Sequence, residues 1–199
     1  MARGGTVVLA GAIVLAGCGG GGTDADPPPV FDWAMFDRLS ARHAATDLPR
    51  GGSARYDGGF VADIRQADVT PSGRIAGGVT LDLDFADRNA TLPIEGRLHD
   101  IEGEFLGAPV RIDDLPLLPG QGRLVLTRDG AQRRGRIEAG FGAELPLAGE
   151  NRRLDIGIET ALRGPGGRAM AGPVSGTILT APFTDQPHVL TGRFHATTD

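Results

Sequence analysis

The sequence predicts an all-β fold: a single antiparallel up-and-down β-barrel of about eight strands, preceded by one short N-terminal helix. Apolar and polar residues alternate through most of the chain after residue 47, which is the period of a strand with one dry and one wet face. The 32 glycines and 14 prolines separate these alternating segments and form no repeat. They therefore predict turns between many short strands. Closure into a barrel would leave no exposed strand edges.

The clearest alternation runs through residues 73–99 and predicts a β-hairpin. One face of its first strand carries Val79, Leu81, Leu83 and Phe85, and the other carries Thr80, Asp82, Asp84 and Ala86. Asp87-Arg88-Asn89 is suited to a tight reversal, after which Leu92, Ile94, Gly96 and Leu98 resume the pattern. A lone hairpin is only marginally stable in water, so further strands must cover its dry side.

The remaining segments supply those strands. Residues 47–64 predict the first strand, and later ones are expected at 101–112 (bent or interrupted at 107–109), 124–126, 135–141, 154–162, 170–178 and 190–196. Asp129-Gly130 predicts a hairpin turn, as does the glycine-rich stretch 164–167. Leu115–Pro119 is apolar but contains prolines, which favours a connection. Inward glycines are expected to relieve crowding and to allow the strands to coil, at Gly96, Gly103, Gly172, Gly176 and Gly192.

The outer face of these strands favours a soluble barrel over a membrane-spanning one. It carries charged residues such as Asp82, Glu95, Arg136 and Asp155, whereas a membrane barrel needs an outward apolar band with aromatic girdles. Aromatic residues make up 5% of the chain, too few to build the girdles.

The first residues have the pattern of a secretory signal peptide, predicted over residues 1–17. Arg3 precedes an apolar run, Thr6–Leu15, that is too short for a permanent membrane span. The run ends in Leu15-Ala16-Gly17-Cys18, which resembles the lipobox of bacterial lipoproteins. The resemblance implies a diacylglycerol thioether on Cys18, cleavage before it and acylation of the new N-terminus. Gly19 in the next position implies an outer-membrane address. An ordinary signal peptide with an incidental cysteine is the alternative.

Two segments precede the predicted barrel, which is expected to fill residues 47–199. Residues 18–30 are rich in glycine and proline and predict a flexible tether. Residues 31–46 predict a short helix, because Met35 and Leu39 share one helical face with Phe31. Trp33 and Phe36 either plug the open end of the barrel, pack along its wall, or form an aromatic pair that binds a ligand.

Three runs in the barrel segment resemble the barrel domain of transferrin-binding protein B and related bacterial surface lipoproteins. They are LPRGGSARYDGGF (48–60), GGVTLDLDFAD (77–87) and LTGRFHA (190–196), and the similarity covers Leu48 to Ala196. It implies a β-barrel, an outer-membrane location, and a role in binding a host protein or an iron- or haem-related ligand. It implies no ligand-contacting residue, so the ligand-binding residues stay unassigned.

The sequence offers no convincing catalytic or metal site, and we expect neither enzymatic activity nor a cofactor. His43, His99, His188 and His195 have no metal-ligand spacing, and Asp82 with Asp84 lacks a ligand-rich loop. No serine occurs in a Gly-x-Ser-x-Gly setting. The formal net charge of −5 argues against nucleic acid as a partner. One arginine cluster surrounds a single predicted turn, and two more arginines stand before the next strand: Arg128, Arg133, Arg134 and Arg136, then Arg152 and Arg153. These arginines predict either solvated hairpin ends or a contact for an anion or an acidic protein.

Together these features predict a monomeric, lipid-anchored outer-membrane lipoprotein. Its partners would be the membrane, through the lipid on Cys18, and an unidentified protein or small molecule presented to its loops. The alternative is a structural lipoprotein of the periplasm or envelope that has no soluble ligand.

Overall fold

The structure is a computed structural model that describes residues 31–66, 69–85, 90–183 and 186–199. The predicted signal peptide, the tether, Cys18 and the turn at 87–89 lie outside the described residues.

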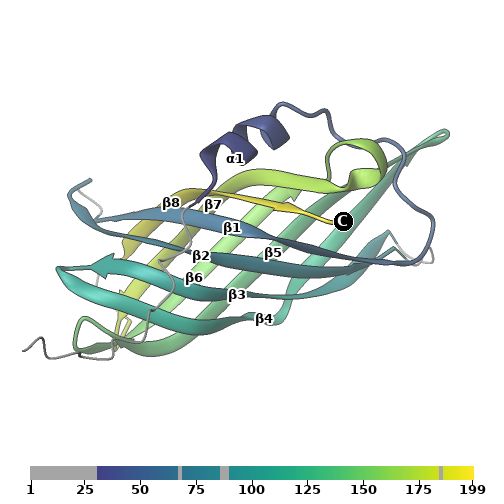
Figure 1. The fold of residues 1–199 in the computed structure, drawn as a ribbon. Helices are drawn as coiled ribbons and strands as arrows, with labels where there is room; N and C mark the ends of the chain where they lie inside the picture. The colour runs from purple at the N-terminus through teal and green to yellow at the C-terminus, as the bar shows by residue number, and fades with distance from the viewer. Residues whose placement is uncertain (1–30, 67–68, 86–89, 184–185) are drawn as a thin grey trace, which may run out of the picture.

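The described residues form the predicted barrel, with each strand antiparallel to the next (Figure 1). The strands are β1 (Ser53–Arg65), β2 (Pro71–Asp84), β3 (Thr91–Phe105), β4 (Ala108–Asp129), β5 (Gln132–Leu147), β6 (Glu150–Ala161), β7 (Ala169–Thr180) and β8 (His188–Thr197). β8 pairs with β1, where Phe194 lies opposite Phe60, and this pairing closes the sheet. The all-β fold with closed up-and-down topology is confirmed.

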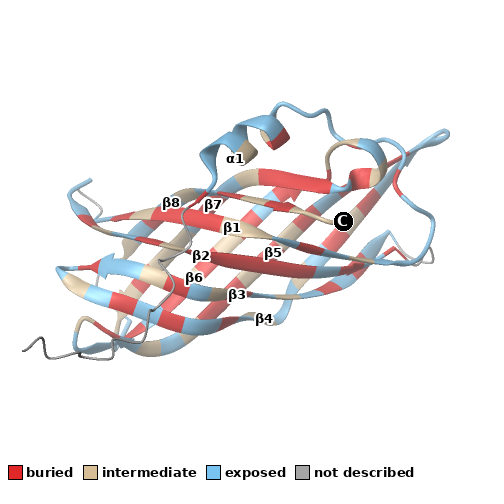
Figure 2. Ribbon diagram, viewed as in Figure 1, coloured by how far each residue is buried: buried red, intermediate tan, exposed pale blue. Residues whose placement is uncertain are grey.

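Apolar side chains fill the interior of the barrel. Buried residues alternate with exposed ones along much of the sheet, although β2 has five consecutive buried residues and β7 begins with three (Figure 2). One continuous cluster occupies the inside, and its largest fully buried rings are Tyr56, Phe60, Phe85, Phe105, Phe141 and Phe194. Eight strands enclose a space that side chains can fill. The barrel is therefore a packed core, and binding has to take place at its ends or on its outer wall.

The two ends of the barrel differ in how the strands are joined. The four-turn end carries the β1–β2, β3–β4, β5–β6 and β7–β8 turns, and lies at the left of Figure 1. The three-turn end carries the β2–β3, β4–β5 and β6–β7 connections. It is also where β1 begins and β8 ends.

The single helix α1 (Trp33–Ser40) lies outside the barrel, over β7 and β8 (Figure 1). The Asp32 carboxylate caps it by accepting a hydrogen bond from the Met35 N–H at 2.8 Å. Leu39 is buried against Ala169 and Ala171, so the aromatic residues of this segment pack along the wall and do not plug an end. The helix is shorter than the predicted 31–46, because the Ala45 N–H donates to the Leu162 carbonyl and joins the sheet instead. No helix among the described residues is long and apolar enough to cross a membrane.

The expectation of a connection at Leu115–Pro119 is wrong, because β4 runs straight through it. Leu117 pairs with Phe141 and Gly122 with Ala139, so the residues between form an outward bulge in a continuous strand. Prolines lack the N–H that a ladder needs, which explains why the pairing shifts here. The predicted bend at 107–109 is instead the tight turn Leu106-Gly107 between β3 and β4.

The glycines predicted to relieve crowding do so mainly between neighbouring strands. A Cβ on Gly192 would lie 1.9 Å from the Val61 carbonyl oxygen of β1. A Cβ on Gly103 would lie 2.0 Å from the Arg74 carbonyl oxygen of β2. Both contacts are with backbone, which cannot move aside as a side chain can. These glycines let adjacent strands coil closely around each other.

Candidate functional site

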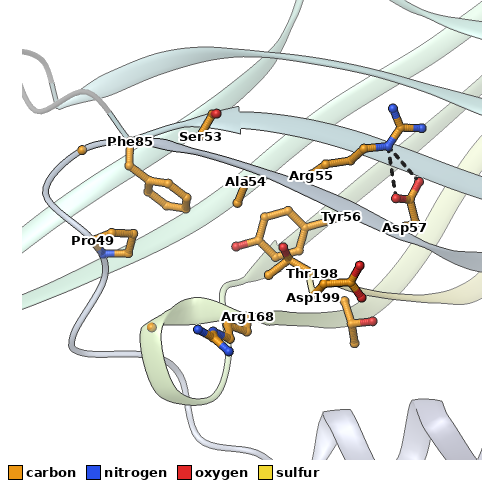
Figure 3. A pocket seen from close by; sticks show the side chains of 14 residues that line it. Pro49, Ser53, Ala54, Arg55, Tyr56, Asp57, Phe85, Arg168, Thr198 and Asp199 are labelled. Carbon is orange, nitrogen blue, oxygen red and sulfur yellow. Dashed lines mark hydrogen bonds and ion pairs between the residues drawn. The ribbon is translucent and has the colours of Figure 1, made fainter.

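A cavity of about 640 Å³ opens at the three-turn end, beside the start of β1 (Figure 3). Its walls come from the Pro49–Asp57 stretch, from Phe85 at the end of β2, from Gly166 and Arg168 before β7, and from the last residues, Thr197–Asp199. These segments are far apart in the sequence, and closure of the barrel brings them together.

The segment before β1 and the loop before β7 are fixed to each other around Tyr56. The Tyr56 hydroxyl donates to the Gly167 carbonyl at 2.8 Å, and the Gly166 N–H donates to an Asp47 carboxylate oxygen at 3.0 Å. Burial raises the pKa of Tyr56 to about 12. The phenol therefore stays protonated and keeps donating at neutral pH, so this wall of the cavity is preformed.

The charges around the cavity are unequally paired. Arg55 pairs with Asp57 at 3.1 Å on the outer wall (Figure 3). Arg168 is exposed, and its guanidinium makes no ion pair or hydrogen bond with any described residue. An arginine with free donors can bind a carboxylate or phosphate through two parallel hydrogen bonds. The cavity therefore offers the Arg168 guanidinium to an anionic group, and the Asp199 carboxylate also lines it.

A chain of polar side chains crosses the outer wall from β1 to β3, next to the cavity. The Thr80 hydroxyl donates to Asp57 at 2.8 Å and lies 3.3 Å from His99 Nε2, while His99 Nδ1 lies 2.7 Å from Asp100. Asp100 has a positive φ of 49° at an irregularity in the β2–β3 pairing, which brings both His99 and Asp100 to the outer face.

This chain holds a hydroxyl, an imidazole and a carboxylate, yet its hydrogen bonds do not activate a nucleophile. The Thr80 hydroxyl has a single proton and donates it to Asp57 at 2.8 Å, so this proton is not donated to His99 Nε2, which lies farther away at 3.3 Å. A general base would instead have to accept that proton. Burial would raise the pKa of Asp57, but hydrogen bonds from Thr80 and Arg55 and the charges of Arg55 and His99 outweigh it and lower the pKa.

The other predicted histidines lie apart from one another. His43 is exposed, and His195 packs 5.0 Å from the Phe31 ring under α1. His188 contacts the Ser72 hydroxyl at 3.1 Å and the Phe105 ring at the four-turn end. Asp82 and Asp84 are exposed on the outer face of β2. Within the described ranges, no three or more His, Cys, Asp or Glu side chains could hold a metal ion.

The predicted arginine cluster divides in two. Arg128, Arg134, Arg136 and Arg153 are exposed, as expected of hairpin ends. Arg133 and Arg152 are buried, one at each end of the barrel, so the expectation of solvation is wrong for them. Arg133 donates to the Phe85 carbonyl at 3.3 Å at the three-turn end. Arg152 lies 4.9 Å from the Phe105 ring centre and pairs with Glu150 at the other end. These two arginines cap the apolar interior.

Two histidines should make the fold weaker in mild acid. Burial lowers the pKa of His188 and of His195; the charge of Arg152 adds to the effect at His188, and that of Asp32 opposes it at His195. The two histidines are therefore protonated at a higher pH in the unfolded chain than in the folded one. As the pH falls below about 6.5, protonation favours the unfolded state and stability decreases. We expect the free energy of unfolding to fall between about pH 7.5 and pH 5.5. His195→Phe should flatten this dependence in urea titrations, and the exposed His43→Asn should not; equal flattening by both variants would contradict the assignment.

Sequence reasoning missed the cavity and the two capping arginines. The alternation pattern indicates that both arginines face inward. Arg152 is in phase with Leu154 and Ile156, and Arg133 is in phase with Gly135 and Ile137. The cavity carried none, because its walls meet only through the closing of the barrel.

Comparison with known proteins assigns no family to the chain, since no family model matches it and no significant match is found among curated proteins. The resemblance to transferrin-binding-protein-like lipoproteins therefore stays a prediction.

Proposed function

We propose that this chain is a lipid-anchored outer-membrane lipoprotein whose barrel binds a protein or small ligand at its three-turn end. The anchor rests on Leu15-Ala16-Gly17-Cys18 after an apolar run, and on the resemblance of the barrel segment to bacterial surface lipoproteins. Several acyl chains hold a protein stably at a bilayer, where one chain would be marginal.

One observation carries the binding role: the barrel interior is filled, while a cavity of about 640 Å³ opens at one end. Small-molecule sites are usually cavities of about 300–1,000 Å³ with apolar walls and a few fixed polar groups. This cavity is lined by the Pro49–Ser53 segment, by Arg168 and by Asp199. An anionic group, either on a small molecule or on an exposed protein side chain, would pair with Arg168.

The anchor is tested on protein isolated from its native host. We expect the N-terminal peptide of the mature chain to begin at Cys18 and to carry the added mass of a diacylglycerol and an acyl group, and Cys18→Ser to remain unmodified and to leave the membrane fraction. Unmodified wild-type protein in the soluble fraction would contradict the proposal.

The binding site is tested with the same protein held on lipid-coated beads. An outer-membrane fraction and an extract of the growth medium are passed over the beads, retained molecules are identified by mass spectrometry, and each is titrated. We expect a saturable partner whose affinity falls about tenfold in Arg168→Gln, as for loss of a charged hydrogen bond. Arg97→Gln on the outer wall of β3 is the matched control and should bind normally. No saturable partner, or equal loss in both variants, would instead favour the structural role.

A further inference from the structure

Every turn at the four-turn end holds an apolar residue in the left-handed backbone region. They are Val69 (φ 68°), Leu106 (φ 50°), Ala148 (φ 49°) and Phe183 (φ 68°), one in each of the β1–β2, β3–β4, β5–β6 and β7–β8 turns. Among the described residues, Asp100 is the one further non-glycine residue with positive φ. We call these four residues the apolar tips.

This conformation is unfavourable for a residue with a Cβ, and most of all for a β-branched residue such as Val69. Leu106-Gly107 and Ala148-Gly149 each have two consecutive positive φ values, as in a type I′ turn. Such turns favour asparagine or aspartate at the first position. At the three-turn end the corresponding backbone is made by Gly130 and Gly166. Folding alone therefore does not explain apolar side chains at all four turns.

Three of the four apolar tips are exposed, while Ala148 is half-buried against the core. Val69 is 71% exposed, Leu106 46% and Phe183 36%, and Val189 beside them at the start of β8 is 39% exposed. Among the described residues, one other large apolar side chain has a comparable exposure, Trp33 on α1. Exposed apolar groups gathered on one part of a protein mark a contact with another protein or a membrane. The tips therefore form a contact surface.

The position of the chain's first described residue favours a membrane as the partner. Phe31 lines a groove on the outer wall together with Glu104 and Pro109, which flank the Leu106-Gly107 turn. Residues 19–30 separate Phe31 from Cys18, and an extended chain spans about 45 Å over that distance. A lipid on Cys18 would thus hold a bilayer within reach of the tips. The four tips lie on separate hairpins. A protein partner would need a matching pocket for each of them, whereas a fluid bilayer surrounds such side chains without pockets.

We propose that the apolar tips dock into the bilayer that holds the lipid on Cys18. This rests on the proposed anchoring for its choice of partner. A few tip side chains bind a bilayer weakly by themselves, and the tether makes their contact effective by keeping them close. The barrel then stands on its four-turn end, and the cavity at the three-turn end faces away from the membrane.

The test uses the full chain in vesicles and does not depend on acylation by the host. Cys18 is the single cysteine, so it can be coupled to a maleimide lipid in phosphatidylcholine vesicles. Trp33→Phe removes the single tryptophan, and Phe183→Trp places a fluorescent probe on a tip. The control probe is Ala131→Trp, exposed in the β4–β5 turn at the opposite end. Bromine atoms on the lipid chains quench tryptophan that enters the bilayer.

We expect brominated lipid to lower the emission of the Phe183→Trp probe about twofold and to leave the Ala131→Trp probe unchanged, because insertion brings the first probe to the acyl chains. Adding Leu106→Asn and Ala148→Asn should restore the emission. It should not lower the melting temperature, because asparagine accepts the left-handed conformation more readily. No quenching at position 183, or equal quenching of both probes, would overturn the inference. So would a blue shift without quenching, which would place a second copy of the chain on the tips. Failed acylation of native Cys18 would count against the proposed anchor alone, because the coupling here is chemical.

Discussion

Gly192→Ala is expected to lower the free energy of unfolding by about 3 kcal/mol, because the new methyl group has no room at the β1–β8 seam. It would lie 1.9 Å from the Val61 carbonyl oxygen and 2.7 Å from the Ala62 Cα. Both atoms belong to the backbone of β1, so the two strands would have to separate at the pairing that closes the barrel. Urea unfolding followed by circular dichroism measures the change.

Gly59→Ala is the matched control for this variant. It lies on β1 in the same sheet, and its Cβ would find only the Gly77 carbonyl oxygen at 3.5 Å, an ordinary contact. We expect a change of about 0.5 kcal/mol or less there. Similar losses in both variants would show that the seam is no tighter than the rest of the sheet.

Phe194→Ala is expected to cost about 3–5 kcal/mol, as for other large-to-small changes in a packed core. Phe194 is fully buried in the interior, opposite Phe60 on the neighbouring strand. Its removal would leave a cavity at the seam, where the first and last strands of the barrel have no covalent link between them.

Phe36→Ala provides the comparison outside the barrel. Phe36 is partly buried where α1 packs on β7, so its truncation exposes little of the main core. Urea titrations should give a clearly smaller loss than at Phe194. An equal loss would mean that the helix contributes to stability as much as the seam does.

Much of the fold could be predicted because it depends on local alternation. The alternation of Val79, Leu81 and Leu83 with polar residues determines which face of β2 points inward. The same alternation in the other strands predicts the closed barrel. The same rule, applied strictly, would also have placed Arg152 inside beside Leu154. An arginine at the start of a strand is more typical of a solvated hairpin end, and here the interior accepts it because its guanidinium lies over the Phe105 ring and pairs with Glu150.

Other features depend on contacts that the sequence does not encode locally. The prolines at Pro116 and Pro119 favoured a connection, yet the neighbouring strands β3 and β5 keep β4 continuous around an outward bulge. The cavity depends on the meeting of Pro49, Phe85 and Arg168, which are brought together by barrel closure alone. Sites of this kind become visible once the pairing of the first and last strands is known.

The cavity wall formed by Thr197–Asp199 has a practical consequence for handling the protein. A purification tag or reporter domain fused behind Asp199 would emerge at the rim of the site and obstruct whatever binds there. An epitope inserted in the β5–β6 turn, near Gly149, would leave that rim open. It would, however, change the turn that holds the apolar tip Ala148. Ligand screens therefore call for a chain with no tag or reporter attached behind Asp199.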